Sequence, residues 1–412
     1  MPIDLRKYKN VVLVFVLFVF LLSLRFFDYV GLDETFYGRF SNAIVLLLIV
    51  FCFIIRKPKV IPGQYWFLGI LLVPILSFLP CWLENGQNPI SSLRAYLGTG
   101  VALVYFLIHG AKVRESDLAK GITILALIRI AILVIQQFTY PDYLFTFRPE
   151  GMNASGLFSK IEVRNGIYRF AIDDTILSMF LVFYYINRYI KSGAPIHLIL
   201  FLIGIVGVYL DQTRQFMLST AVAVCIVLLF SSRMKYKWAV ICILCVTAAV
   251  ALLNATVLFE DMLLMTENDL TADNIRLLTY ATYLFEFWGG PLSIIFGNGP
   301  VAHDSAYGDQ VAYMYENMKM FHSDVGIVGA ANLYGVVTVL FIIAFYVFFV
   351  FRNWKKIPMH VKMYYIATLV NMPMICIYTQ GRHYMVFFAL MLFFADRSIR
   401  RYDYIQMMRC RA

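Results

Sequence analysis

The sequence predicts an all-α, polytopic membrane bundle of about twelve transmembrane helices, with both termini in the cytoplasm. Three observations predict this fold class. Hydrophobic residues make up 61% of the 412 residues and charged residues only 15%, which is not the composition of a soluble surface. Apolar runs recur along the whole chain, each about long enough to cross a hydrocarbon core roughly 30 Å thick. Lys and Arg concentrate in alternate connecting segments.

The apolar runs define the predicted spans, and we expect residues 1–412 to form a single integral membrane domain. The spans are 11–27, 42–55, 65–82, 95–109, 119–138, 170–187, 196–210, 214–231, 238–257, 325–351, 363–379 and 384–395. No small-residue cleavage site follows the first run, so we expect this helix to be retained rather than removed as a signal peptide.

Charge sets the predicted orientation of the bundle. One set of alternating segments holds 23 Lys and Arg against 5 Asp and Glu: 1–10, 56–60, 110–120, 188–195, 232–237, 352–362 and 396–412. The opposite set holds 11 against 20, and Arg129 lies alone within a predicted span. The positive-inside rule makes the basic set cytoplasmic. The net charge of +10 is therefore a topological signature and indicates no nucleic-acid partner.

Two external loops are too long to be simple connectors, 139–169 and 258–324, and long ordered loops usually carry function. In the second loop, residues 274–288 predict an apolar helix that lies along the membrane interface or against the bundle. Gly289–Pro291 and Phe296–Pro300 then predict turns. We expect this large external loop to bear part of the functional site.

The candidate anion-binding residues stand where helices begin on the outer face. In the predicted topology Arg169, Arg214, His322 and Arg382 lie at the N-termini of helices, whose free N–H groups and positive dipole ends favour anions. Arg276 in the long loop is a fifth candidate. A guanidinium group suits bidentate phosphate binding, so a lipid-linked diphosphate is the expected guest. The alternative for each Arg is a headgroup anchor or a local ion pair.

Two residues at the start of the same predicted helix are candidates for proton transfer. His322 could take a proton from an incoming hydroxyl as a neutral imidazole, and Asp324 is a competing base. The alternative for His322 is a hydrogen-bonded interfacial residue. Arg129 differs from the other arginines because a charge near the middle of a span requires a partner, and we expect a structural ion pair there.

Several patches, in order, resemble the O-antigen polymerase and O-antigen ligase superfamily of bacterial membrane glycosyltransferases. They are Leu210–Ala221 with its Thr-Arg pair, the long late loop with Arg276, Phe296-Gly-Asn-Gly299, Phe321-His322-Ser-Asp-Val-Gly, and Tyr334-Gly335. The resemblance covers roughly residues 139–395. It implies that Arg214 and Arg276 hold undecaprenyl diphosphate and that His322 assists the acceptor hydroxyl. Ser323 stands where ligases commonly have Asn.

The resemblance implies a polymerase of lipid-linked oligosaccharide repeats, for O-antigen or exopolysaccharide, in the bacterial inner membrane with its active site facing the periplasm or exterior. The donor would be an undecaprenyl-diphosphate-linked oligosaccharide and the acceptor a glycan hydroxyl, with a flippase and a chain-length regulator as candidate partners. Diphosphate is already a competent leaving group, so an inverting displacement needs charge neutralisation rather than a metal or cofactor.

Three alternatives remain. The first is an O-antigen ligase that transfers polymer to the lipid A core. The second rests on Asp33-Glu34 and Tyr37, which resemble the Asp-Glu-x-x-Tyr patch of glycosyltransferases fed by polyprenyl monophosphate sugars, although the short connection leaves little room for their juxtamembrane helices. The third is a flippase or transporter, but such proteins tend to show related halves and the sequence shows no internal repeat.

Overall fold

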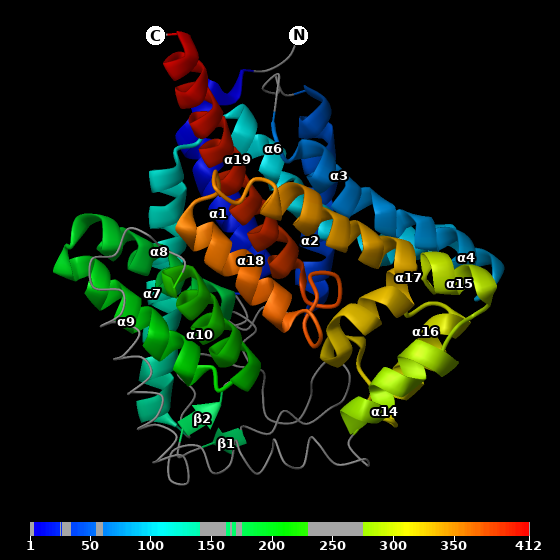
Figure 1. The fold of residues 1–412 in the computed structure, drawn as a ribbon. Coiled ribbons are helices and arrows are strands. Elements are labelled where there is room, and N and C mark those ends of the chain that lie inside the picture. Colours follow the sequence, from blue (N-terminus) through cyan, green and yellow to red (C-terminus); the bar gives the residue numbers. More distant parts are fainter. Residues whose placement is uncertain are drawn as a thin grey trace. The chain divides into compact units, whose positions relative to one another are not determined.

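The computed structural model describes residues 4–24, 26, 34–54, 61–140, 162–164, 167–169, 175–229 and 275–411. In these ranges the chain is mostly helical, as predicted (Figure 1). It divides into two compact units. The first unit comprises residues 1–120, 275–358 and 372–412, and the second comprises 121–274 and 359–371.

The first unit contains most of the helices. They are η1 (Leu5–Tyr8), α1 (Lys9–Ser23), α2 (Glu34–Ile54), α3 (Gln64–Leu72), η3 (Val73–Ser77), α4 (Phe78–Leu83), α5 (Pro89–Leu97), η4 (Gly98–Leu103), α6 (Val104–Gly110), α14 (Ile275–Ala281), η5 (Thr282–Glu286), α15 (Pro291–Phe296), α16 (Ala306–Glu316), η6 (His322–Val325), α17 (Gly326–Ala344), η7 (Phe345–Phe351) and α19 (Arg382–Arg411). Helix α7 (Glu115–Thr139) begins in the first unit and ends in the second.

Four continuous helical stretches of the described chain are long and apolar enough to cross a membrane. They are Gln64–Leu83, Pro89–Gly110, Glu115–Thr139 and His322–Phe351. Each coincides with a predicted span. Shorter apolar helices at Arg39–Ile54, Pro195–Leu210 and Arg214–Leu229 coincide with three more. The predicted span 238–257 lies outside the described residues, and the prediction of twelve spans remains a prediction.

Helix α19 is the central helix of the first unit. Its residues from His383 to Ala395 are almost continuously buried, and it packs against η4, α6 and α1 (Figure 1). An all-round apolar helix is expected in the interior of a bundle. Arg382, Asp396 and Arg397 flank this buried stretch, which contains the predicted span 384–395. Helix α19 is not one of the four long apolar stretches given above.

The fully buried carboxylate of Asp396 joins three elements of this core. It accepts hydrogen bonds from the backbone N–H of Gly63, which caps α3, at 2.7 Å and from the Tyr105 hydroxyl of α6. His109 Nε2 lies 3.3 Å from the same carboxylate, and Arg400 donates to His109 Nδ1 at 3.0 Å. A buried charge requires such partners. Asp396 is therefore a structural anchor.

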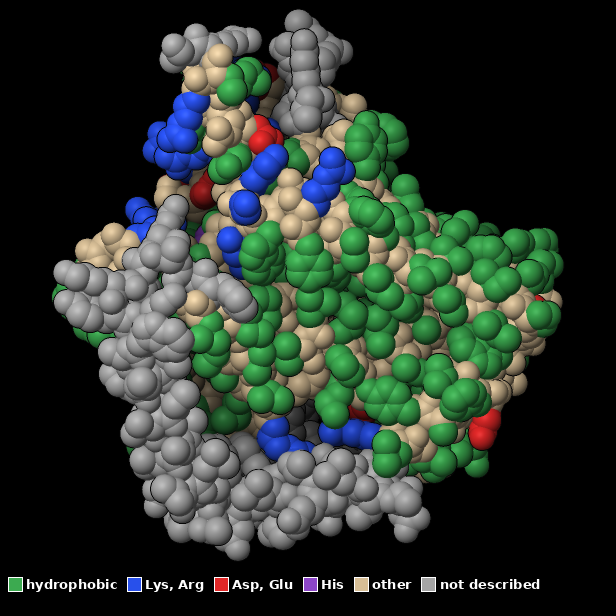
Figure 2. Space-filling model, in the orientation of Figure 1, with side chains coloured by type: hydrophobic (Ala, Val, Ile, Leu, Met, Phe, Trp, Pro, Cys, Tyr) green, Lys and Arg blue, Asp and Glu red, His purple; other side chains and the backbone are tan. Residues whose placement is uncertain are grey.

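The surface of the first unit separates apolar from basic side chains. Hydrophobic side chains cover the face formed by α3, α4 and α17, whereas Lys and Arg gather around the C-terminal end of α19 (Figure 2). Helices α14 and α16 lie at the opposite end of this unit (Figure 1). Further Lys and Arg side chains are visible at the lower edge of the view (Figure 2). A wide apolar surface next to a group of basic residues is a distribution that membrane proteins show.

The second unit contains β1 (Glu162–Arg164), β2 (Ile167–Arg169), α8 (Thr175–Ser192), α9 (Pro195–Leu210), α10 (Arg214–Leu229) and α18 (Met359–Asn371). Helices α8 and α9 form a tight hairpin that turns at Gly193, and α18 packs against α8 and α10. Strands β1 and β2 pair antiparallel in the 139–169 loop, with Val163 opposite Tyr168. The all-α prediction did not include this short hairpin.

A buried ion pair joins three helices of the second unit. Arg129 of α7 is fully buried and pairs with both carboxylate oxygens of Asp211, at the end of α9. It also donates to the Ser178 hydroxyl of α8 at 3.0 Å. The expected structural ion pair of Arg129 is confirmed.

Candidate active site

The site of the first unit is built around a break in α17. Gly335 adopts φ 80° and ψ 165°, which interrupts the helix and exposes the carbonyl groups of the preceding turn. The turn at Phe296–Gly299 fills this break: Asn298 N donates to Asn332 O and Gly299 N donates to Leu333 O, both at 2.8 Å. A broken helix buried in protein can lend its backbone to a site within a membrane bundle.

Glycine is required at both sides of this contact. A Cβ on Gly297, whose φ is 94°, would meet the backbone of Leu333 and Gly335. A Cβ on Gly335 would meet the backbone of Ile295 and Phe296. Both positions therefore need a residue without a side chain as well as a positive φ. The Gly-x-Gly and Tyr-Gly patches, about 35 residues apart in sequence, are one structural feature.

Asn332 is the central side chain of the feature. Its buried amide nitrogen donates to the carbonyl oxygens of Tyr283 at 3.0 Å and Phe287 at 2.7 Å. Since these carbonyls only accept, the orientation of the amide is determined, and its Oδ1 must act as an acceptor. That oxygen lies 3.1 Å from both His322 Nε2 and Asn298 Nδ2. One amide thus joins the long loop to α17.

His322 is only 2% exposed and has a partner at each ring nitrogen. Its Nε2 faces the Asn332 oxygen, and its Nδ1 lies 2.7 Å from the Tyr315 hydroxyl. The imidazole also stacks on the ring of Tyr283, with centroids 3.9 Å apart. Burial raises the pKa of Tyr315 above its usual value, so the phenol keeps its proton and donates it to Nδ1.

These contacts define the tautomer of His322 and limit its chemistry. Nε2 must carry the proton because Asn332 Oδ1 accepts there, and the lone pair of Nδ1 is occupied by Tyr315. No ring nitrogen is left to receive a proton from an incoming hydroxyl directly. The arrangement favours a positioning role for His322, in which it holds Tyr315 and Asn332.

Arg276 and Asp324 lie close to this network. Arg276 is the second residue of α14, which packs beside η6, and its charge acts on both Asp324 and Tyr280. Asp324 is exposed, whereas His322 two residues before it is buried. Tyr280 anchors α14 by donating a hydrogen bond to the Pro373 carbonyl. The cation of Arg276 and the exposed carboxylate of Asp324 therefore lie close together at the N-terminal end of α17.

Arg382 is the first residue of α19 and lies in the same unit. Its guanidinium group packs against η4 at Gly98, where a Cβ would collide with it. Gln380, just before α19, donates to the Ser323 carbonyl at 2.9 Å and so links this helix start to η6. Of the predicted site residues, the first unit thus contains Arg276, His322, Asp324 and Arg382.

The other two predicted arginines belong to the second unit. Arg214 is the first residue of α10, as predicted, and is half-buried. The next residue, Gln215, donates to the Asn371 carbonyl at the end of α18 at 3.0 Å. Arg169 ends β2, and its side chain lies outside the described residues, as do the side chains of Asp33, Glu34 and Tyr37.

The short connection between α4 and α5 contributes residues that we did not predict. Gln87 is fully buried: its amide nitrogen donates to the Pro300 carbonyl at 2.8 Å, and its oxygen accepts from Ala302 N and the Ser305 hydroxyl. Asn85 donates to the Asn298 carbonyl at 3.1 Å. The one sequence feature that could have indicated their role was the polar run Glu84–Asn88 between two apolar stretches.

Glu84 of the same connection holds the start of α15. Its carboxylate accepts from the N–H groups of Leu292 and Ser293, both at 2.9 Å, and from the Ser293 hydroxyl. Burial by itself would raise the pKa of Glu84, but these three hydrogen bonds outweigh burial and lower the pKa. The carboxylate thus acts as an N-terminal cap from another helix.

Taken with the four membrane-length helices, this geometry defines a class: a helical membrane protein whose broken helix α17 supports a histidine, arginine and aspartate cluster. No protein-family model matches the chain, and no curated protein matches it either.

Proposed function

We propose that the chain is a bacterial inner-membrane glycosyltransferase that polymerises lipid-linked oligosaccharide repeats on the external face. The observation that carries this proposal is that three sequence patches meet in one structural feature. The patches around Gly297, His322 and Gly335, which are separate in sequence, join one hydrogen-bonded feature, and Arg276 lies beside it. Such convergence supports a common functional site rather than unrelated local resemblances.

The proposed topology has twelve spans and cytoplasmic termini. It is supported by the concentration of Lys and Arg at the C-terminal end of α19 and by the position of α14 and α16 at the other end of the first unit. In this orientation the cluster of Arg276, His322 and Asp324 faces the periplasm or exterior, where lipid-linked repeats are the substrates.

In the proposed reaction an acceptor sugar hydroxyl attacks the anomeric carbon of the donor glycan. The new carbon–oxygen bond forms as the bond to the diphosphate oxygen breaks, and the electron pair leaves with undecaprenyl diphosphate. Arg276 neutralises the charge that develops on the diphosphate, and Arg382 of the same unit is a further proposed ligand. Arg214 and Arg169 of the second unit are candidate ligands from the sequence alone. No metal or cofactor takes part in this scheme.

Asp324 is the proposed base that receives the proton of the acceptor hydroxyl. It is exposed and lies within reach of the charge of Arg276, whereas both nitrogens of His322 are already occupied. Binding of a diphosphate to Arg276 withdraws this cation from Asp324, which makes the carboxylate a better proton acceptor. His322 then positions the start of α17.

Glycan analysis of a deletion strain that carries plasmid-borne variants tests the proposal. Arg276→Ala and Arg214→Ala should leave single repeats and no polymer ladder, with unchanged amounts of protein in the membrane. Arg94→Ala is the matched control, because Arg94 lies in the first unit and forms only an exposed, 3.9 Å ion pair with Asp304. A normal ladder in both site variants would remove the proposal.

The same strain separates the alternatives. Loss of a polymerase leaves single-repeat capping, whereas loss of a ligase leaves full-length polymer on its lipid carrier. Loss of a flippase leaves lipid-linked single repeats on the cytoplasmic side of the membrane.

A further inference from the structure

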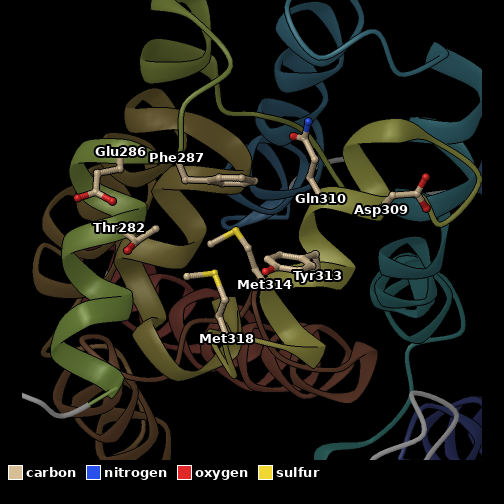
Figure 3. Close-up of a pocket in the computed structure, with 8 residues that line it drawn as sticks. All are labelled: Thr282, Glu286, Phe287, Asp309, Gln310, Tyr313, Met314 and Met318. Atoms are coloured by element: carbon tan, nitrogen blue, oxygen red, sulfur yellow. The ribbon is translucent and has the colours of Figure 1, made fainter.

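An open pocket lies between η5 and α16 in the first unit (Figure 3). Its volume is about 550 Å³, within the range of roughly 300–1,000 Å³ of small-molecule sites. The lining consists of Thr282, Glu286, Phe287, Asp309, Gln310, Tyr313, Met314 and Met318. Four of these side chains are polar or acidic and four are aromatic or methionine, a mixture that suits a ligand with both apolar and hydroxyl-bearing faces.

The centre of the pocket is apolar and partly flat. Phe287, Tyr313, Met314 and Met318 point toward one another across it (Figure 3). Tyr313 is 61% exposed, so the face of its ring is accessible from the pocket. The C–H face of a sugar ring packs well on such a surface.

The margin of the pocket offers hydrogen-bonding groups that the described part of the chain does not use. Within those residues the side chains of Glu286, Asp309 and Gln310 make no hydrogen bond or ion pair, and all three are exposed. Glu286 and Asp309 stand at opposite margins (Figure 3). Carboxylates accept hydrogen bonds from hydroxyl groups, and the amide can donate and accept.

Charge decides which part of a substrate fits. Among the described residues, two carboxylates and no Lys or Arg line the pocket, so a phosphate or diphosphate is repelled by this lining. Uncharged sugar hydroxyls are hydrogen-bond donors that both carboxylates can accept. The pocket therefore suits glycan and not the lipid diphosphate.

The floor of the pocket is continuous with the His322 network. The Phe287 carbonyl accepts from Asn332 and from Asn298, and Met314 precedes Tyr315, whose hydroxyl donates to His322. Met314 and Phe287 also pack in one apolar cluster with Tyr283. A ligand in the pocket would thus rest on the segments that hold the proposed site.

We propose that this pocket binds the uncharged sugars of the acceptor glycan, separately from the arginines that bind the donor diphosphate. The assignment of the bound glycan as the acceptor rests on the proposed function. Tyr313 provides the stacking surface, and Glu286 and Asp309 accept hydrogen bonds from sugar hydroxyls.

The test uses the full chain in lipid nanodiscs and, as the probe, the lipid-free oligosaccharide released by mild acid from the host's lipid-linked glycan. Binding is measured by saturation-transfer NMR and calorimetry. Tyr313→Ala and Asp309→Asn should each weaken binding about tenfold, equivalent to one lost stacking or hydrogen-bonding contact. Inorganic pyrophosphate should not displace the oligosaccharide.

Two variants serve as matched controls and should bind like the wild type. Tyr404→Ala removes a tyrosine that is 63% exposed on the last part of α19, and Glu316→Gln neutralises an exposed carboxylate on α16 outside the pocket. Absence of binding by the wild type, equal binding by the pocket variants, or displacement by pyrophosphate overturns the proposal.

Arg276→Ala separates this proposal from the proposed function. If the Arg276→Ala variant binds the oligosaccharide like the wild type but makes no polymer, both the glycan pocket and the proposed function are supported. If Arg276→Ala and Arg214→Ala still make polymer while the pocket variants bind weakly, the glycan pocket stands and the diphosphate mechanism fails. If polymer is lost but the pocket variants bind like the wild type, the pocket assignment fails alone.

Discussion

Replacing Asn332 by alanine removes four side-chain hydrogen bonds at once: two donated to the carbonyls of Tyr283 and Phe287, and two accepted from His322 and Asn298. Each is worth about 0.6 kcal/mol in helical membrane proteins and about 1 kcal/mol in soluble ones. The expected loss in the free energy of unfolding is therefore about 2–4 kcal/mol.

Asn353→Ala is the matched control. Among the described residues, the Asn353 side chain donates one hydrogen bond, 2.9 Å long, to the Phe349 carbonyl near the other end of the same membrane-length stretch. We expect a loss of about 0.6–1 kcal/mol there. The assay is equilibrium unfolding of the purified full chain in mixed micelles. A loss for Asn332→Ala no larger than that for Asn353→Ala would refute the central position given to Asn332.

Four further predictions concern single elements of the fold. Arg129→Ala leaves Asp211 buried without its ion-pair partner and should destabilise the protein by about 3–5 kcal/mol, whereas a paired change of both residues to Leu should recover most of this loss in the same unfolding assay. Asp396→Ala should cost about 1–3 kcal/mol in that assay, because it orphans the backbone N–H of Gly63, the N-cap residue of α3. Gly335→Ala should lower the yield of folded protein in size-exclusion chromatography, since φ is 80° and the backbone of α15 leaves no room for a Cβ. Because the pKa of Glu84 is lowered in the folded protein, its stabilising effect is present above the unfolded pKa and is lost as the pH falls through the folded pKa. Glu84→Gln should therefore flatten the decline in melting temperature below about pH 4.5. An unchanged decline would count against the role of Glu84 as a cap.

Much of the fold was predictable because membrane insertion imposes a strong one-dimensional pattern. Runs of apolar residues predicted all four stretches that are long enough to cross a membrane, and the isolated charge of Arg129 predicted a buried ion pair. The partner of Arg129 was less predictable. Asp211 is 82 positions from Arg129 in the sequence, and the hydrophobic pattern does not show which helices bring the two together.

Helix starts were predictable at the candidate site, but partners across the fold were not. Arg214, His322 and Arg382 each begin a helix, as the polar-to-apolar transitions indicated. The enclosure of His322 depends on Tyr315 and Asn332, which are 7 and 10 residues away in sequence and lie on two different helices, α16 and α17. Sequence patterns cannot show which nitrogen of a buried histidine is already occupied.

The role of the Glu84–Asn88 connection was missed for a related reason. Its residues act on segments more than 200 positions later, with separations such as 213 between Asn85 and Asn298. A polar connection between two apolar stretches normally indicates solvent exposure. The full burial of Gln87 arises only because the long loop folds back over it.

The most direct test of the central claim is reconstitution of the purified full chain in liposomes with an undecaprenyl-diphosphate-linked repeat unit on the accessible face. The proposed function predicts a glycan ladder, one undecaprenyl diphosphate released for each repeat added, and neither product with Arg276→Ala. Movement of intact lipid-linked repeat across the bilayer without any ladder or diphosphate release would contradict it.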